Sequence, residues 1–159
     1  MKRHHTFLAA AAVLLAAATT LTGCLDEENP NDPTATRMLS AAINGTDWNA
    51  TTTSATRIVP PAAMTVVGSG GGTQLTLNIG AAATGTYSLG GSEHVAICRY
   101  NGAEFATNRP NSTGTLTITA YDETKKLLSG TFSFTAYNAA GEHITLTNGH
   151  FANVKWAEQ

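Results

Sequence analysis

Thr73-Gln74-Leu75-Thr76-Leu77-Asn78-Ile79 is the stretch that decides the fold class of this chain. Its apolar side chains fall on every second residue, and polar side chains lie between them. A period of two is typical of a half-buried β-strand, because successive side chains of a strand point to opposite faces. The stretch therefore predicts a strand over 73–79, with Leu75, Leu77 and Ile79 facing a core.

The same alternation continues on both sides of this stretch, from about residue 36 to the C-terminus. No window there has the three-and-four spacing of an amphipathic helix. Turn residues such as Asn44-Gly45 and Pro60-Pro61 separate the alternating runs. The strands expected from this pattern cover residues 37–44, 48–58, 62–68, 73–79, 85–89, 93–101, 103–107, 114–121, 128–137 and 143–156.

About nine or ten short antiparallel strands must either close into a barrel or split into two packed sheets. We therefore expect an all-β fold, a single antiparallel β-sandwich or flattened barrel that ends in a C-terminal meander. In the last strands, Phe132 and Phe134 should face inward. Gly149 should mark a bulge, after which Phe151 and Val154 return to the core.

The N-terminus has the features of an export signal that ends in a lipidated cysteine. Lys2 and Arg3 are followed by a short apolar run, Phe7 to Ala18, which is too short to span a bilayer as a helix. Leu21-Thr22-Gly23-Cys24 follows and has the form of a lipobox. We expect residues 1–23 to be a lipoprotein signal peptide and Cys24 to carry the acyl chains that anchor the protein to a membrane.

Residues 24–35 are expected to form an acidic flexible tether, and residues 36–159 a single all-β domain. The acidic cluster in 26–32 resembles the tags by which some Gram-negative bacteria place lipoproteins on the cell surface. The alternative is that these acids only keep the tether solvated and so extend the reach of the domain. We expect an outer-membrane lipoprotein that faces the cell surface, with a periplasm-facing domain as the alternative.

The charges of the folded part balance, with seven basic and seven acidic residues over 33–159. A neutral domain lacks the basic surface that nucleic-acid binding requires, so we expect no nucleic-acid partner. After lipidation of Cys24, Cys98 is the one remaining cysteine, and it lies in an alternating apolar segment. We interpret it as a small buried hydrophobic residue rather than a nucleophile.

Tyr100, Tyr121 and Tyr137 fall on the polar phase of their expected strands. Outward tyrosines on a β-surface can form an aromatic platform for a ligand such as a sugar, and these three are our candidate ligand-binding residues. The alternative is that they pair across strands and stiffen the sheet.

Catalytic and metal-binding chemistry has little support in this sequence. His143 and His150 lie seven apart on one expected strand, which places them on opposite faces unless the bulge restores the phase. Glu93, Glu104, Asp122 and Glu142 lie at expected turns or strand ends, where solvated acids are common. We expect no catalytic residues, no metal and no cofactor.

Five segments follow one another along the chain in an order that resembles the sequences of a family of small lipoproteins of unknown function from Gram-negative bacteria. They are Asn44-Gly45-Thr46-x-Trp48-x-Ala50, Gly85-Thr86-Tyr87-x-Leu89, Gly114-Thr115-Leu116-Thr117-Ile118-Thr119, Ser129-Gly130-Thr131-Phe132-Ser133-Phe134-Thr135-Ala136 and Ile144-Thr145-Leu146-Thr147-Asn148-Gly149-x-Phe151. The resemblance covers nearly all of 38–156 and implies an anchored all-β domain without a known activity.

Two functions remain open from the sequence. The first is a non-enzymatic binding or accessory module, with a monomeric folded domain, for a glycan, a peptide or a protein. The second is a calycin-like carrier that holds a small apolar molecule inside a closed barrel. They differ in whether the interior between the sheets is filled or hollow.

Overall fold

The computed structural model describes residues 38–159, which form eleven β-strands and no helix. The all-β expectation is confirmed. Over these residues, no helix is long and apolar enough to cross a membrane. The signal peptide, Cys24 and the tether lie outside the described residues. The strands are β1 (Met38–Ile43), β2 (Thr46–Asn49), β3 (Thr52–Ile58), β4 (Ala63–Gly70), β5 (Thr73–Ile79), β6 (Gly85–Leu89), β7 (Val95–Tyr100), β8 (Ala103–Ala106), β9 (Thr113–Asp122), β10 (Leu127–Tyr137) and β11 (His143–Glu158).

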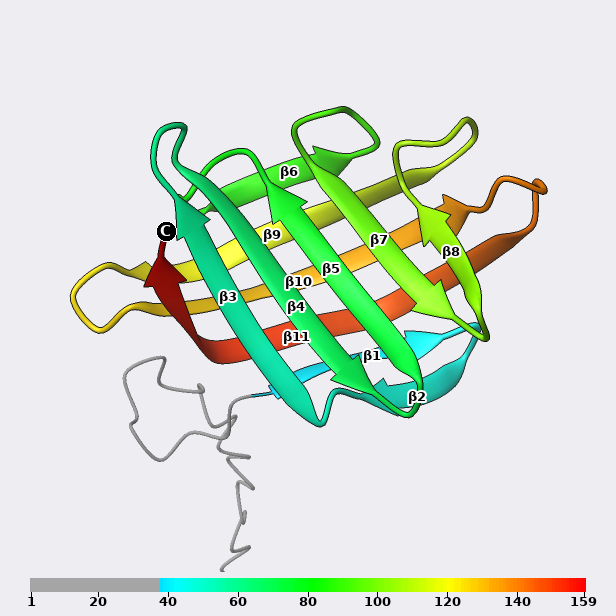
Figure 1. The fold of residues 1–159 in the computed structure, drawn as a ribbon, viewed down its shortest axis with the longest axis horizontal. Helices are drawn as coiled ribbons and strands as arrows, with labels where there is room; N and C mark the ends of the chain where they lie inside the picture. The colour runs from blue at the N-terminus through cyan, green and yellow to red at the C-terminus, as the bar shows by residue number, and fades with distance from the viewer. Residues whose placement is uncertain (1–37) are drawn as a thin grey trace, which may run out of the picture.

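The strands form two layers that face each other across the core (Figure 1). The front layer has the order β3-β4-β5-β7-β8, and the rear layer has the order β2-β1-β11-β10-β9-β6. Figure 1 shows the front strands running across the rear strands rather than along them, as in orthogonally packed sheets. The expected meander is confirmed, because β9, β10 and β11 pair antiparallel in sequence order.

Two junctions join the layers into a flattened barrel. At one corner the end of β11 pairs parallel with β3, with Trp156 opposite Ala55. At the other corner Tyr137 of β10 lies opposite Ala106 of β8. The sandwich or flattened barrel expected from the sequence is therefore confirmed, with one parallel pairing in an otherwise antiparallel arrangement.

The strand expected over 48–58 is wrong as one element, because the chain changes layers at Ala50. β2 pairs with β1 in the rear layer, whereas β3 pairs with β4 in the front layer. Gly70 makes this corner possible, since a Cβ atom there would lie 2.6 Å from the carbonyl oxygen of Asn49. Trp48 also donates from its ring nitrogen to the carbonyl of Gly70 at 2.9 Å. The corner depends on these long-range contacts, which local alternation does not encode.

The core lies between the layers and is filled by side chains from both. In the front layer Leu75 and Leu77 of β5 are fully buried, as expected, and Ile79 is 1 % exposed. In the rear layer Phe132 and Phe134 are buried with their ring centroids 6.1 Å apart. These residues belong to one continuous apolar cluster.

Three core phenylalanines of the rear layer each lie opposite a glycine of the neighbouring strand. The pairs are Phe134 with Gly114, Phe151 with Gly130, and Phe132 with Gly149. A Cβ atom on any of these glycines would overlap its phenylalanine. Gly130 and Gly149 make room for the rings, and Gly114 makes room for the Cβ atom and backbone of Phe134. Glycine–aromatic pairs of this kind pin strand register in sheets.

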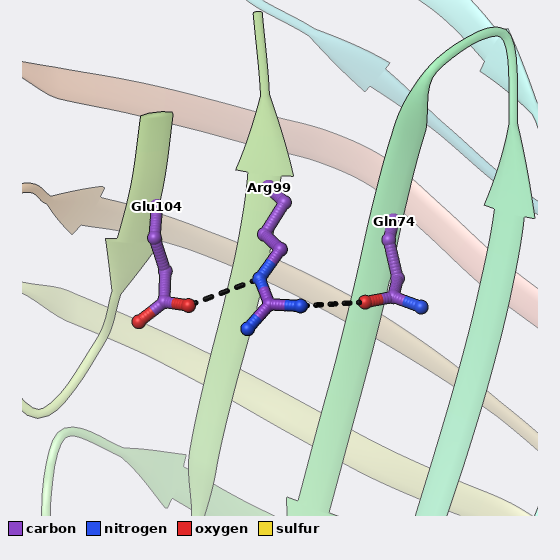
Figure 2. A network of polar contacts seen from close by, with 3 residues as sticks. All are labelled: Gln74, Arg99 and Glu104. Atoms are coloured by element: carbon purple, nitrogen blue, oxygen red, sulfur yellow. Dashed lines mark hydrogen bonds and ion pairs between the residues drawn. The ribbon is translucent and has the colours of Figure 1, made fainter. Parts of the chain in front are cut away.

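The outer face of the front layer has a polar ladder across three strands (Figure 2). Arg99 of β7 donates from Nε to Glu104 of β8 at 3.1 Å and from Nη1 to Gln74 of β5 at 3.5 Å. The arginine and glutamate side chains are 64 % and 44 % exposed, so this ion pair contributes little to stability.

Candidate functional site

The outer face of the rear layer is dominated by threonine and serine. It arises because the inward positions of β1, β9, β10 and β11 are apolar while hydroxyl side chains occupy the positions between them. We call this surface the hydroxyl face. Its hydroxyl residues are Ser40, Thr86, Ser88, Thr113, Thr115, Thr117, Thr131, Ser133, Thr135, Thr145 and Thr147.

The pairing register aligns these residues into rows that cross the strands. In the longest row, Thr86, Thr117, Thr131, His150 and Ser40 lie opposite one another in turn. The hydroxyls of Thr86 and Thr117 are 3.0 Å apart, and the Ser40 hydroxyl lies 3.2 Å from Nδ1 of His150. Five strands thus contribute one polar side chain each to a continuous line.

A parallel row lies nearer the β10–β11 turn. Thr113, Thr135 and Thr145 lie opposite one another, and the hydroxyls of Thr135 and Thr145 are 3.3 Å apart. Neighbouring strands are about 4.8 Å apart, and alternate residues of one strand are about 6.7 Å apart. The hydroxyl groups therefore repeat in two directions across the face.

A bulge in β11 interrupts the rows at Thr147-Asn148, one residue before the expected position at Gly149. Leu146 lies opposite Phe134 and Gly149 opposite Phe132, so β11 has one extra residue between these pairs. Asn148, in the bulge, takes the left-handed conformation with φ of 52°. The side chain of Asn148 is exposed in the middle of the face, beside His150.

Three open hollows lie along this face, with volumes of about 330, 380 and 390 Å³. Asn148 and His150 line two of them, so those two hollows adjoin at the bulge. The third is lined by Thr113, Thr135, Thr145 and their neighbours. Of all the residues that line the three hollows, Asp47 alone has a formal charge.

This surface can exchange many hydrogen bonds with an uncharged polar ligand. Each serine or threonine hydroxyl offers one donor and two acceptor positions, and Asn148 adds an amide. Sugars present the same mixture of donors and acceptors.

Residues 35–155 match the model of a protein family described as a domain of unknown function, DUF6252. The chain belongs to the DUF6252 family. The match begins just before β1 and ends within β11, so it includes both layers and the hydroxyl face. It confirms the part of the sequence resemblance that pointed to a family of unknown function. No curated protein and no solved structure matches the chain.

Two of the three candidate tyrosines of this DUF6252 domain do not lie on an outer face. Tyr100 shares the inward phase of β7 with Cys98 and packs against the core. A bulge at Thr119 reverses the phase of β9, because Ala120 lies opposite Ser129 while Ile118 lies opposite Gly130. The outward placement expected for these two tyrosines is therefore wrong.

Tyr121 instead forms part of the corner between β11 and β3. Its ring stacks on Trp156, with centroids 5.7 Å apart, and its hydroxyl donates to Glu123 at 3.3 Å. Burial raises the pKa of Tyr121, and the carboxylate of Glu123 adds to the rise. Arg57 and Lys126 lie over the Trp156 ring at 5.6 and 5.3 Å. This cluster holds the two layers together.

Tyr137 is the candidate tyrosine that lies on the hydroxyl face. It occupies the outward phase of β10 and is half-buried, and its ring centroid lies 5.4 Å from that of His143. Thr135, two residues earlier on the same strand, lines the nearby hollow. The hydroxyl face thus has an aromatic pair at one end.

The bulge in β11 brings His143 and His150 to the same face of the sheet. This is one of the two alternatives that their spacing in the sequence left open. His143 lies opposite Tyr137 and His150 opposite Thr131, so both lie on the hydroxyl face. Over residues 38–159, no three histidine, cysteine, aspartate or glutamate side chains gather as a metal site requires. Three of the four acids examined for catalysis make local contacts, Glu104 with Arg99, Asp122 with the backbone of Lys125, and Glu142 with Asn138.

Cys98 is fully buried and unpaired, as its alternating segment predicts. Burial raises the pKa of its thiol to about 12, so the thiolate that a nucleophile needs is absent near neutral pH.

Alternation within single strands did not predict the hydroxyl face. The signal was present in the sequence, since Thr113-x-Thr115-x-Thr117, Thr131-x-Ser133-x-Thr135 and Thr145-x-Thr147 repeat on successive strands of the meander. A meander places consecutive strands side by side, so hydroxyls repeated on all three strands must form rows.

Proposed function

We propose that this protein is a membrane-anchored, non-enzymatic binding module whose ligand is a glycan that lies across the hydroxyl face. The observation that carries the proposal is the alignment of hydroxyl side chains from β6, β9, β10, β11 and β1 into one row beside open hollows. Hydroxyl groups are both donors and acceptors, so such a surface complements a chain of sugar hydroxyls.

The charge of the face also favours a glycan over nucleic acid. Asp47 is the one charged residue that lines the hollows, and an acidic group repels phosphate. The Tyr137–His143 pair at the end of the face offers a surface on which a sugar ring can stack.

The filled core supports binding on the outside of the domain rather than inside it. Leu116 and Leu128 of the rear layer and Leu75 and Leu77 of the front layer are all fully buried within one cluster. The described hollows lie on the hydroxyl face instead.

The anchor and the location complete the proposal. The lipobox supports acylation of Cys24, and the acidic residues that follow it favour an outer-membrane lipoprotein on the cell surface. The folded domain is a monomer that presents the hydroxyl face to its ligand.

The test is native gel electrophoresis of the mature chain in gels that contain laminarin, xylan, mannan or dextran. We expect at least one polysaccharide to retard the protein. Thr117→Val and Thr131→Val together remove two neighbouring hydroxyls and keep side-chain shape. The loss of hydrogen bonds worth about 1.4 kcal/mol in total would weaken binding about tenfold.

The matched control is Thr76→Val, a half-buried threonine on the outer side of the front layer, opposite Val67 and Ile97. It should leave the retardation unchanged. The proposal fails if no polysaccharide retards the protein, or if the double variant binds as tightly as the control.

A further inference from the structure

The last residue of β3 and the loop between β3 and β4 expose a run of apolar residues. Ile58, Val59, Pro60, Pro61 and Ala62 are consecutive and all are exposed to solvent. Ile58 and Val59 are each 44 % exposed, and over residues 38–159 they are the two large hydrophobic side chains that stand in solvent. Apolar groups gathered at one exposed point commonly mark an interaction site.

Charged side chains of both signs lie close to this loop. Arg57 immediately precedes it and pairs with Glu123 at 3.5 Å, and Arg57 and Lys126 both lie over the ring of Trp156. Lys125 and Lys126 come from the β9–β10 turn, which Figure 1 places at the same side of the molecule as the end of β3 and the C-terminus. An apolar tip beside exposed lysines, next to an arginine whose charge is balanced by Glu123, suits the boundary between acyl chains and headgroups.

The chain enters the fold at this side of the rear layer. Met38, the first residue of β1, lies opposite Ala152 of β11, and the two strands are antiparallel. β1 therefore begins toward the C-terminal end of β11, the end that pairs with β3 beside the loop. Cys24 precedes Met38 by 14 positions, and even a fully extended chain of that length spans at most about 50 Å.

We infer that the loop Ile58–Ala62 inserts into the bilayer that holds the Cys24 lipid, while Lys125 and Lys126 contact its headgroups. The inference rests on the lipid anchor of the proposed function. Apolar insertion at a second point fixes the orientation of a tethered domain. The outer faces of both layers, including the hydroxyl face, then stand at the sides of the domain and remain open to ligand (Figure 1).

The experiment measures how deeply a fluorophore at the loop enters lipid. Val59→Cys in the full lipidated chain is labelled with an environment-sensitive dye. Cys98 stays unlabelled because it is fully buried. The matched control is Ala140→Cys, an exposed position in the β10–β11 turn at the other end of the rear layer. The vesicles are phosphatidylcholine with about a quarter phosphatidylglycerol, and spin-labelled phosphatidylcholine serves as the quencher.

We expect a blue shift and at least threefold stronger quenching at position 59 than at position 140. Equal quenching at the two positions in a lipidated chain overturns the inference and leaves the anchor standing. A blue shift at position 59 that grows with protein concentration without vesicles identifies a second copy as the occupant and also overturns it. The intact mass of the chain reports the acyl groups separately, and their absence overturns both the anchor and the inference.

Discussion

At the scale of single residues, Tyr121 and Tyr137 show how environment separates two side chains of the same type. Tyr121 lies in the inward register after a bulge and stacks on Trp156, while Tyr137 stays on the outer face beside His143. The first ring connects the two layers, and the second is available to a ligand.

We expect Tyr121→Ala to lower the free energy of unfolding by about 2 kcal/mol, because it removes a stacked, partly buried ring. Tyr137→Ala should cost less than about 1 kcal/mol, as is usual at half-exposed positions. Urea denaturation of the two variants checks this. Equal losses would mean that both rings are structural and would remove Tyr137 from the binding face.

Cys98 predicts a loss of stability in alkali. Its pKa is raised from 9.0 to about 12 by burial, so the folded state keeps the thiol proton at pH values where the unfolded state loses it. Stability is therefore fully present below pH 9 and falls by about 1.4 kcal/mol per pH unit as the pH rises toward 12. Urea denaturation across this range measures the slope. In Cys98→Ala the free energy of unfolding should fall less steeply with pH by that amount. An unchanged slope would contradict the assignment of the effect to the Cys98 thiol.

At the scale of elements, the strand pairs of the meander depend on contacts between glycine and phenylalanine. Gly149 lies opposite Phe132 next to the Asn148 bulge, and its missing side chain leaves room for the ring. The same bulge shapes two hollows of the hydroxyl face, so packing on the inner side is linked to the shape of the proposed binding surface on the outer side.

Gly149→Ala should destabilise the domain by about 1–3 kcal/mol, because the added methyl group overlaps the ring of Phe132. Gly91→Ala is the matched control, since a Cβ atom there meets nothing within 4 Å. Thermal unfolding of both variants gives the comparison. Adding Phe132→Leu to Gly149→Ala should recover part of the loss, and strictly additive effects would argue against direct contact.

The faces of most strands could be predicted from the sequence, because alternation encodes which side of a strand is buried. Leu75, Phe132 and Phe134 lie inward as their positions predict. The corner at Ala50 and the bulge at Thr119 could not be predicted, because neither follows from local alternation. The corner depends on the close approach of Gly70, and the bulge is defined only by the register of β9 against β10. Because of this bulge, Tyr121 lies on the inner face of β9 and not on the outer face expected from the sequence. The hydroxyl face was missed although its spaced threonines stand in the sequence of the meander, and only the register between strands decides which of them share a row.

At the scale of the whole molecule, two crossed layers leave two outer faces of different chemistry. The front layer has a charged ladder of Gln74, Arg99 and Glu104, and the rear layer has the hydroxyl face (Figures 1 and 2). The β3–β11 corner closes the barrel around a filled core. The proposed ligand would therefore meet the domain from outside, where the rear layer has the hollows.

The most direct test is methyl NMR of the mature chain during titration with the polysaccharide that retards it. We predict that the methyl signals of Thr117, Thr131 and Thr135 shift, while that of Thr76 on the front layer stays in place. Shifts confined to the front layer would contradict the account. Shifts confined to core methyls such as those of Leu75 and Leu146 would also contradict it, since they would place the ligand between the layers.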